Sequence, residues 1–173
     1  QKNQYQDTPS VPFTMGLEVA GTITAIGPNT KSPKIGTRVT VFAGQGGLAE
    51  YGYFPAERLI EIPDTMPSEV AAGFQVAYGT SHLALKHCAG LKKNNTLLVL
   101  GAAGGVGLTA VELGKYFGAQ VLAAARGKEK LKIAQEFGAD VLIDTNTDNL
   151  VEVVKSLGGA DVVYDPIGGE LFK

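Results

Sequence analysis

Leu97-Leu98-Val99-Leu100-Gly101-Ala102-Ala103-Gly104-Gly105-Val106-Gly107-Leu108 is an apolar run that breaks into glycines and then resumes with a helical pattern. This order is typical of a strand, a tight turn and a helix. Such a turn leaves the first N–H groups of the helix free, with the positive end of the helix dipole behind them, which suits a pyrophosphate. Glycines allow the backbone to approach a phosphate closely. We therefore expect Gly104, Gly105 and Val106 to contact a nucleotide.

The glycine spacing is less specific than its surroundings. The pattern G-x-G-x-x-G is not met, because Ala102 stands where its first glycine falls. A helix of about 12 residues follows, and a second apolar strand over residues 120–125 comes at the distance that a βαβ unit requires. A glycine-rich turn without a ligand remains the alternative.

Apolar strands and amphipathic helices alternate in the second part of the chain. Strands are expected at 97–100, 120–125, 141–143 and 161–164, and helices between them at 128–137 and 149–157. This alternation indicates a parallel sheet covered on both faces. A complete dinucleotide fold has about six strands in the order 3-2-1-4-5-6. The predicted class is therefore α/β, with an incomplete Rossmann-type doubly wound parallel sheet.

The first part of the chain indicates a β region. Short alternating runs predict strands at 17–26, 38–42, 48–54 and 59–62, with residues 44–47 as a hairpin loop. Pro67 or Ser68 is well placed to begin a helix over residues 69–72, and an apolar helical stripe follows from 74 to 86. We place the domain boundary here, giving domains 1–67 and 68–173.

Composition excludes several classes of function. The 173 residues include 15 basic and 17 acidic ones, a net charge of −2, without a basic run of the kind that binds nucleic acid. No apolar stretch approaches the roughly 20 residues of a membrane span. The single cysteine, Cys88, excludes an internal disulfide and a multi-cysteine zinc site. The first residues do not form a signal peptide and include no initiator methionine. We expect a cytoplasmic chain that starts inside a longer protein.

The end of the second strand bears on the choice of nucleotide. NAD sites usually carry an acidic residue there, whereas this chain has Ala125, followed by Arg126 and, about one helical turn on, Lys130. A guanidinium and an ammonium can share a 2′-phosphate, which favours NADPH. Solvated charges at a helix start are the alternative interpretation.

These residues resemble the medium-chain dehydrogenase/reductase superfamily, and within it the zinc-free quinone oxidoreductases. The resemblance covers almost the whole chain. It rests on Pro12-Phe13-x-x-Gly16-Leu17-Glu18-Val19-Ala20-Gly21-Thr22-Ile23, on Gly36-Thr37-Arg38-Val39, on Gly47-Leu48-Ala49-Glu50-Tyr51, on the glycine turn 101–107, on Phe137-Gly138-Ala139-Asp140 and on Asp165-x-x-Gly168-Gly169. It implies part of a GroES-like catalytic domain followed by the first part of an NAD(P)-binding domain.

The resemblance also implies site residues. Thr80 matches the segment that carries a threonine near the nicotinamide, Lys130 matches the family's lysine, and Asp165 begins the motif after the fourth strand. Thr145 stands where many relatives carry a tyrosine beside the 2′-phosphate, which weakens its assignment. No catalytic donor is assigned, because a substrate role for Tyr78 competes with simple packing.

Departures from the zinc-dependent alcohol dehydrogenases suggest that no metal is bound. Leu17 replaces a histidine ligand, a cysteine ligand would fall near Ala72, and the segment between Val39 and Gly47 is too short for a structural zinc lobe. Without a Lewis acid, a conjugated acceptor is favoured, because conjugation spreads the charge as hydride arrives. We expect NADPH-dependent reduction of a quinone or another small conjugated carbonyl. An alkenal or enoyl reductase and a non-catalytic NADPH-binding protein remain alternatives, and a homodimer is left open.

Overall fold

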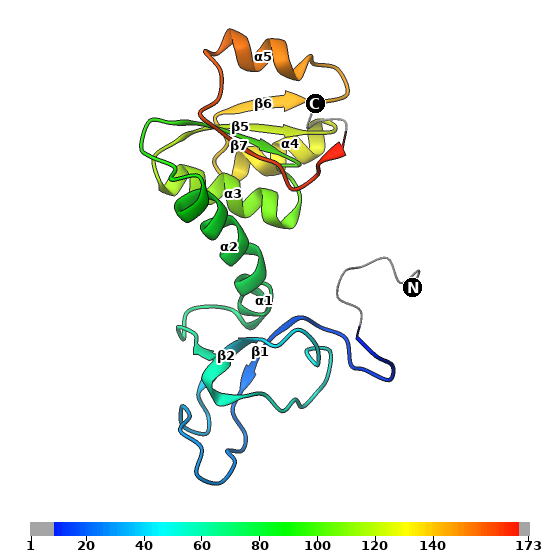
Figure 1. Cartoon of the computed structure of the whole chain (residues 1–173), viewed down its shortest axis with the longest axis vertical. Coiled ribbons are helices and arrows are strands. Elements are labelled where there is room, and N and C mark those ends of the chain that lie inside the picture. Colours follow the sequence, from blue (N-terminus) through cyan, green and yellow to red (C-terminus); the bar gives the residue numbers. More distant parts are fainter. Residues whose placement is uncertain (1–8, 170–173) are drawn as a thin grey trace. The chain divides into compact units, whose positions relative to one another are not determined.

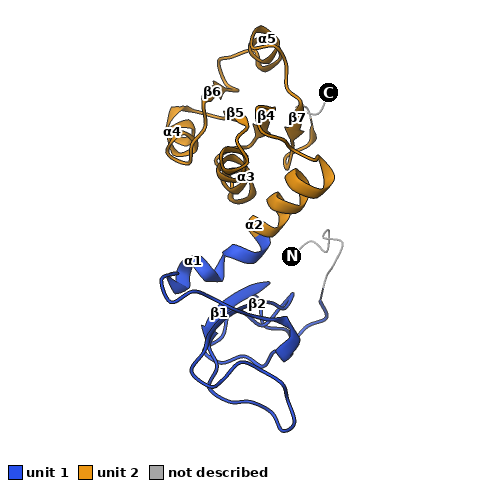
Figure 2. Cartoon of the chain, turned by 90° about the vertical axis from the view of Figure 1, so that its left-hand side faces the viewer, with its two compact units in different colours: residues 1–76 blue, residues 77–173 orange. Residues whose placement is uncertain are grey.

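The structure is a computed structural model that describes residues 9–169. The chain divides into two compact units, Gln1–Val76 and Ala77–Lys173, coloured separately in Figure 2. The division falls within α2 (Phe74–His82). The boundary expected between residues 67 and 68 stays a prediction.

The first unit contains a three-stranded antiparallel sheet in the order β1-β2-β3. Its strands are β1 (Glu18–Thr22), β2 (Arg38–Phe42) and β3 (Leu59–Glu61), with a 3₁₀ turn, η1 (Ala56–Arg58), before the last. The central strand β2 carries the buried residues of this sheet, Val39, Thr40 and Val41. The helix expected after Pro67 is confirmed as α1 (Ser68–Ala72).

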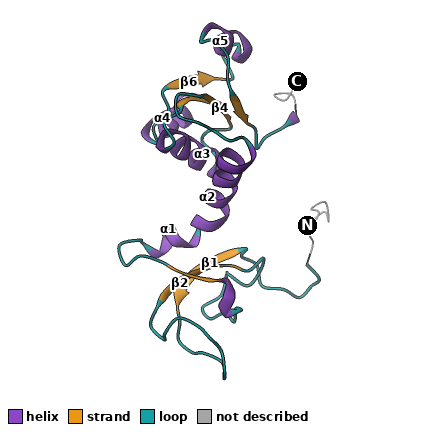
Figure 3. Cartoon of the chain, turned by 60° about the vertical axis from the view of Figure 1, so that its left-hand side comes forward, coloured by secondary structure: helices purple, strands orange, loops and turns teal. Residues whose placement is uncertain are grey.

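The strand predicted over residues 48–54 is wrong, and so is the hairpin loop at 44–47. Residues 48–54 lie in loop and bend conformations (Figure 3). The N–H of Gly46 donates to the carbonyl of Thr14 at 2.8 Å, and that of Leu48 donates to Met15 at 2.8 Å. Gly47 packs so closely that an added Cβ would lie 2.6 Å from the carbonyl oxygen of Glu18. The glycines therefore let this loop pack closely on the segment of residues 14–18 and do not form a hairpin turn.

The second unit is built on a four-stranded parallel sheet in the order β6-β5-β4-β7. Its strands are β4 (Thr96–Leu100), β5 (Gln120–Ala125), β6 (Val141–Asp144) and β7 (Val162–Tyr164). These are the first four strands, 3-2-1-4, of the six-stranded dinucleotide-binding order, so the predicted fold class is confirmed.

Helices cover both faces of this sheet (Figure 1). Val99, Val121 and Ala123 pack on one face with residues of α3 (Gly105–Tyr116) and α4 (Lys128–Glu136). Leu98, Leu100, Leu122, Ala124 and Ile143 pack on the other with α5 (Leu150–Ser156). Except for the first residue of each, the central strands β4 and β5 are buried on both sides, which explains their continuous apolar sequence. The helical stripe predicted from residue 74 is confirmed as α2 and continues as a π-helix, η2 (Leu83–Cys88).

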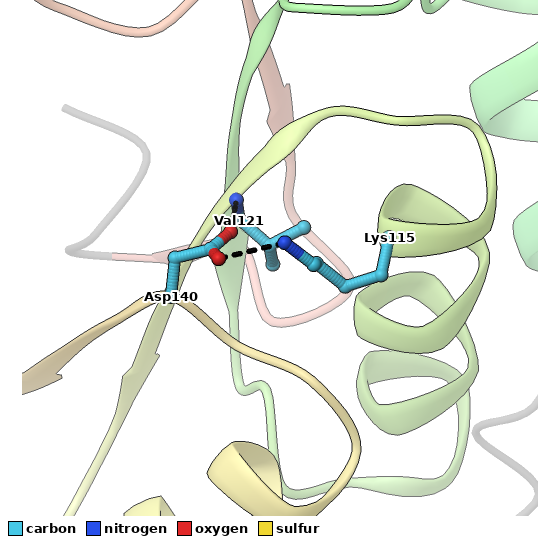
Figure 4. Close-up of polar contacts among 3 residues, drawn as sticks. All are labelled: Lys115, Val121 and Asp140. Atoms are coloured by element: carbon cyan, nitrogen blue, oxygen red, sulfur yellow. Dashed lines mark hydrogen bonds and ion pairs between the residues drawn. The ribbon is translucent and has the colours of Figure 1, made fainter.

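Two aspartates set the register at the amino edge of the sheet. Asp140 Oδ2 accepts the N–H of Val121 at 2.7 Å, and Asp161 Oδ2 accepts the N–H of Thr96 at 2.7 Å. Asp140 Oδ1 also lies 2.6 Å from Lys115 Nζ on α3, as Figure 4 shows. Each aspartate stands immediately before one strand and accepts a backbone N–H of the neighbouring strand. These side chains therefore join the strands at the edge opposite the predicted nucleotide site.

Candidate nucleotide-binding edge of the parallel sheet

Four turns meet at the carboxyl edge of the sheet because parallel strands end on the same side. Leu100 pairs with Ala124, Ala125 with Asp144, and Val99 with Tyr164. The β4–α3 turn, the β5–α4 turn, the β6–α5 loop and the segment after β7 therefore leave one edge together. These segments and the first residues of α3 and α4 carry all predicted nucleotide contacts except Thr80: Gly104, Gly105, Val106, Arg126, Lys130, Thr145 and Asp165.

The β4–α3 turn has the features that a phosphate loop needs. Gly101 has φ +63°, a conformation that glycine adopts readily, and an added Cβ on Gly107 would lie 2.2 Å from the carbonyl oxygen of Gly101. Helix α3 starts after Gly104 without a side-chain cap. The first N–H groups of a helix have no partner within it, so those of α3 can donate hydrogen bonds to an anion bound at this edge.

The β5–α4 turn presents positive charge. Arg126 and Lys130 are exposed, and within residues 9–169 neither makes an ion pair. The last residue of β5 is Ala125, which is 6% exposed. An alanine there provides no carboxylate for a ribose hydroxyl. The side chains are thus accessible to a phosphate.

Asp144, the last residue of β6, lies at the same carboxyl edge and was not among the residues expected from the sequence. Its Oδ1 accepts the N–H of Gly127 at 2.9 Å and that of Asn146 at 3.0 Å. These two hydrogen bonds, Gly127 first, lower the pKa of Asp144, with a smaller contribution from the charge of Lys128, whereas desolvation acts in the opposite direction. Its position at the end of a strand before Thr-Asn-Thr-Asp was the available signal, since aspartates favour such turns.

Asp165 combines a satisfied oxygen with an unsatisfied one. Oδ1 accepts the N–H groups of Ile167 at 2.9 Å and Gly168 at 2.8 Å, which fixes the turn after β7. Oδ2 is buried and has no hydrogen-bond partner within the described residues. The side chain of Ile167 lies over the phosphate turn, 2.7 Å from a Cβ built on Gly101. A buried carboxylate oxygen without a donor is costly, so a ligand hydroxyl or N–H at this edge would relieve it.

A buried hydroxyl cluster connects α2 with the start of α3. Ser81 is fully buried, and its Oγ donates to the carbonyl of Val106 at 2.8 Å. The same Oγ lies 2.8 Å from Thr109 Oγ1 and 3.2 Å from the hydroxyl of Tyr164. Thr80, the neighbour of Ser81, is exposed. This cluster was not predictable from the sequence, since a serine and a threonine 28 residues apart give no local signal of contact.

Tyr78 is held by a hydrogen bond to Glu112 of α3, in which the phenol donates to Oε2. Desolvation and this carboxylate raise the pKa of Tyr78 to about 12. A phenol with a raised pKa that already donates its proton to a carboxylate is a poor proton donor for a substrate.

Two broader features are evident within residues 9–169. No helix there is long and apolar enough to cross a membrane. The same residues contain no group of three His, Cys, Asp or Glu side chains placed to hold a metal ion.

Comparison with known proteins defines the class to which this fold and edge belong. Residues 1–64 match the family model described as "Alcohol dehydrogenase GroES-like domain", and residues 105–173 match "Zinc-binding dehydrogenase". The chain is 41% identical to the quinone oxidoreductase-like protein 2 homolog of Nematostella vectensis, over 98% of this chain and 48% of that protein. The chain spans about half the length of the curated relatives it matches.

Solved structures give the same result. Escherichia coli quinone oxidoreductase, solved in complex with NADPH, matches with a TM-score of 0.89 at 29% identity, over 96% of this chain and 52% of that chain. The CurK enoyl reductase matches with a TM-score of 0.83 at 28% identity, over 92% of this chain and 49% of that chain. The class is a GroES-like domain joined to a Rossmann-type domain. The chain belongs to the quinone oxidoreductase-like group of the medium-chain dehydrogenase/reductase superfamily.

Proposed function

We propose that this chain binds NADP(H) at the carboxyl edge of β4–β7 as part of an oxidoreductase. The observation that carries the proposal is the meeting of the uncapped glycine turn before α3 with the exposed Arg126 and Lys130 on one sheet edge. The NADPH complex of the Escherichia coli relative supports it.

The residues at the edge fit the parts of this cofactor. The N–H groups of Gly105 and Val106, at the start of α3, would bind the pyrophosphate, and Arg126, Lys130 and Thr145 would hold the 2′-phosphate. The orphaned Oδ2 of Asp165 would accept a hydrogen bond from a ribose hydroxyl. Thr80 is proposed on the nicotinamide side. NADPH, when bound, supplies the hydride, while the chain's own residues bind, orient and exclude water.

The substrate proposed for the whole protein is a quinone or another small conjugated carbonyl, reduced without zinc. The names of the relatives support the quinone class. Leu17 and Ala72 offer no metal-binding atom at the positions where zinc-dependent relatives carry ligands. Elemental analysis of purified protein tests zinc independence: one zinc per chain would contradict it, and so would loss of the fold on chelation.

An enoyl or alkenal reductase is the second candidate, favoured by the similarity to the CurK enoyl reductase. Steady-state rates of the full-length protein on a panel of quinones, enals and enoyl thioesters would separate the two. Tight NADPH binding without oxidation in the presence of any acceptor would indicate a non-catalytic relative.

Isothermal titration of NADPH and NADH tests the cofactor proposal. We expect NADPH to bind more tightly by about 1–3 kcal/mol, the range for one or two charge-assisted hydrogen bonds to the 2′-phosphate. Arg126→Ala combined with Lys130→Ala should remove most of the difference. Lys132→Ala combined with Lys155→Ala removes the same charge from exposed helix positions and should preserve the difference. Equal affinities of the wild-type protein for both nucleotides would contradict the proposal.

A further inference from the structure

The β5–α4 turn and the β6–α5 loop are joined just beyond the sheet by one side chain. Oδ1 of Asp144 accepts the N–H of Gly127 in the first segment and that of Asn146 in the second, at 2.9 and 3.0 Å. Beside it, the N–H of Thr145 donates to the carbonyl of Ala125 at 3.1 Å. The ends of two neighbouring strands are thus held together by a carboxylate and a backbone hydrogen bond.

Gly127 is the residue through which this carboxylate acts. It has φ +88°, lies between Arg126 and the first residue of α4, and is the N-cap of that helix, which has no side-chain cap. The orientation of its peptide therefore sets both the direction in which Arg126 leaves β5 and the start of the helix that carries Lys130. Its N–H is fixed by Asp144 alone among the described contacts.

The Asp144 side of the contact is itself supported. The N–H of Asp144 donates to Asp148 Oδ2 at 2.8 Å, and Thr147 Oγ1 donates to Asp148 Oδ1 at 3.0 Å. Hydrogen bonds between residues of the loop after β6 therefore hold its conformation, in addition to the bond from Asp144 to Gly127. A preformed loop of this kind can position its neighbour at a smaller entropic cost on binding.

We propose that Asp144 is a positioning residue for recognition of the cofactor's 2′-phosphate, acting through Gly127 on Arg126 and Lys130 and through Asn146 on Thr145. This inference rests on the proposed NADP(H) site. The role that we assign to Asp144 runs through its Oδ1, which accepts hydrogen bonds from two backbone N–H groups. Its contribution is to preference for the 2′-phosphate, not to binding of adenosine as such.

Titration calorimetry with two half-cofactors isolates this role. Adenosine 2′,5′-bisphosphate and 5′-AMP differ only by the 2′-phosphate and need no nicotinamide site. We expect the wild-type chain to prefer the bisphosphate, and Asp144→Ala to reduce that preference about tenfold with little change for 5′-AMP. Asp144→Asn retains an oxygen acceptor for both N–H groups and should keep the preference within about twofold.

Asp161→Ala is the matched control, because Asp161 makes the same kind of carboxylate–backbone bond at the opposite edge of the sheet. It should lower stability without changing the preference. An equal loss of preference in Asp161→Ala and Asp144→Ala, or an unchanged preference in Asp144→Ala, would overturn the positioning role. A wild-type chain with no preference would instead overturn the 2′-phosphate site itself.

Amide hydrogen exchange gives a second measurement on the unmodified chain, which does not depend on the variant folding. The bisphosphate should slow exchange at Gly127 more than 5′-AMP does, since it holds the turn that Asp144 fixes. Equal protection by the two nucleotides would count against the inference.

Discussion

Gly107 lies at the closest approach between α3 and the turn before it. A Cβ there would lie 2.2 Å from the carbonyl oxygen of Gly101, which is backbone and cannot move aside cheaply. We expect Gly107→Ala to destabilise the chain by about 1–3 kcal/mol, the range for overpacking in a well-packed site. Urea denaturation measures this.

Gly105 provides the control for this substitution in the same helix turn. An added Cβ at Gly105 meets nothing within 4 Å. Because alanine has the higher helix propensity, Gly105→Ala should be neutral or slightly stabilising. Equal destabilisation by both substitutions would show that the turn tolerates no side chain for reasons other than this close approach.

The carboxylate of Asp144 makes stability depend on pH in acid. Its folded-state pKa is depressed below the ordinary value of 3.8, chiefly by the Gly127 N–H. Its stabilising contribution is therefore present above pH 3.8 and is lost as the pH falls through the lower folded value. Unfolding free energies of the wild-type and Asp144→Asn chains, measured by urea from pH 6 downward, should converge below about pH 3.8. If the two unfolding free energies differed by the same amount from pH 6 to below pH 3.8, the carboxylate of Asp144 would not be the source of this pH dependence.

At the scale of the elements, strand register at the amino edge depends on aspartates placed one residue before the strands. Asp140→Ala leaves the part-buried N–H of Val121 without its acceptor, so we expect a loss of about 1–2 kcal/mol. The ion pair with Lys115 is more than one-third exposed on both sides and adds little. Lys115→Met and Asp140→Asn should each cost no more than about 0.5 kcal/mol in urea denaturation. Equal costs for Asp140→Ala and Lys115→Met would show that the ion pair dominates.

The contact of α2 with α3 depends on the buried hydroxyl of Ser81. Ser81→Ala removes the donor to the Val106 carbonyl and a neighbour of both Thr109 and Tyr164, so we expect a loss of about 1–3 kcal/mol of unfolding free energy. Ser156 supplies the control, because its exposed hydroxyl bonds only within its own helix. Ser156→Ala should be nearly neutral, and a similar cost for both would argue against a special role of the cluster.

At the scale of the whole molecule, the chain spans about half the length of its curated relatives, and the sheet of the second unit has four strands within the described residues. We expect a preparation that contains only these 173 residues to bind the adenosine half of NADPH and to show no acceptor-dependent NADPH oxidation. Near-attack geometry for hydride transfer requires walls around the nicotinamide in addition to a phosphate turn. Turnover at an ordinary enzymatic rate, with the composition verified by mass spectrometry, would refute this.

The sequence by itself determined the parallel sheet and the glycine turn at its carboxyl edge. Buried parallel strands need continuous apolar runs, and helix starts after them need glycines, so Leu97–Leu100 and Gly101–Gly107 carry a local signal. The strand of residues 120–125 and helix α5 after Asn149 were predictable for the same reason, since periodicity and caps are short-range.

The tertiary structure alone decided which polar groups meet. Residues 48–54 alternate like a strand, yet their neighbouring glycines pair with the loop at Thr14–Gly16, because backbone partners are chosen by packing rather than by pattern. Asp144 reaches Gly127 across 17 residues, and Ser81 meets Tyr164 across 83. Hydrogen bonds over such separations are set by how strands and helices are brought together, which no local pattern encodes.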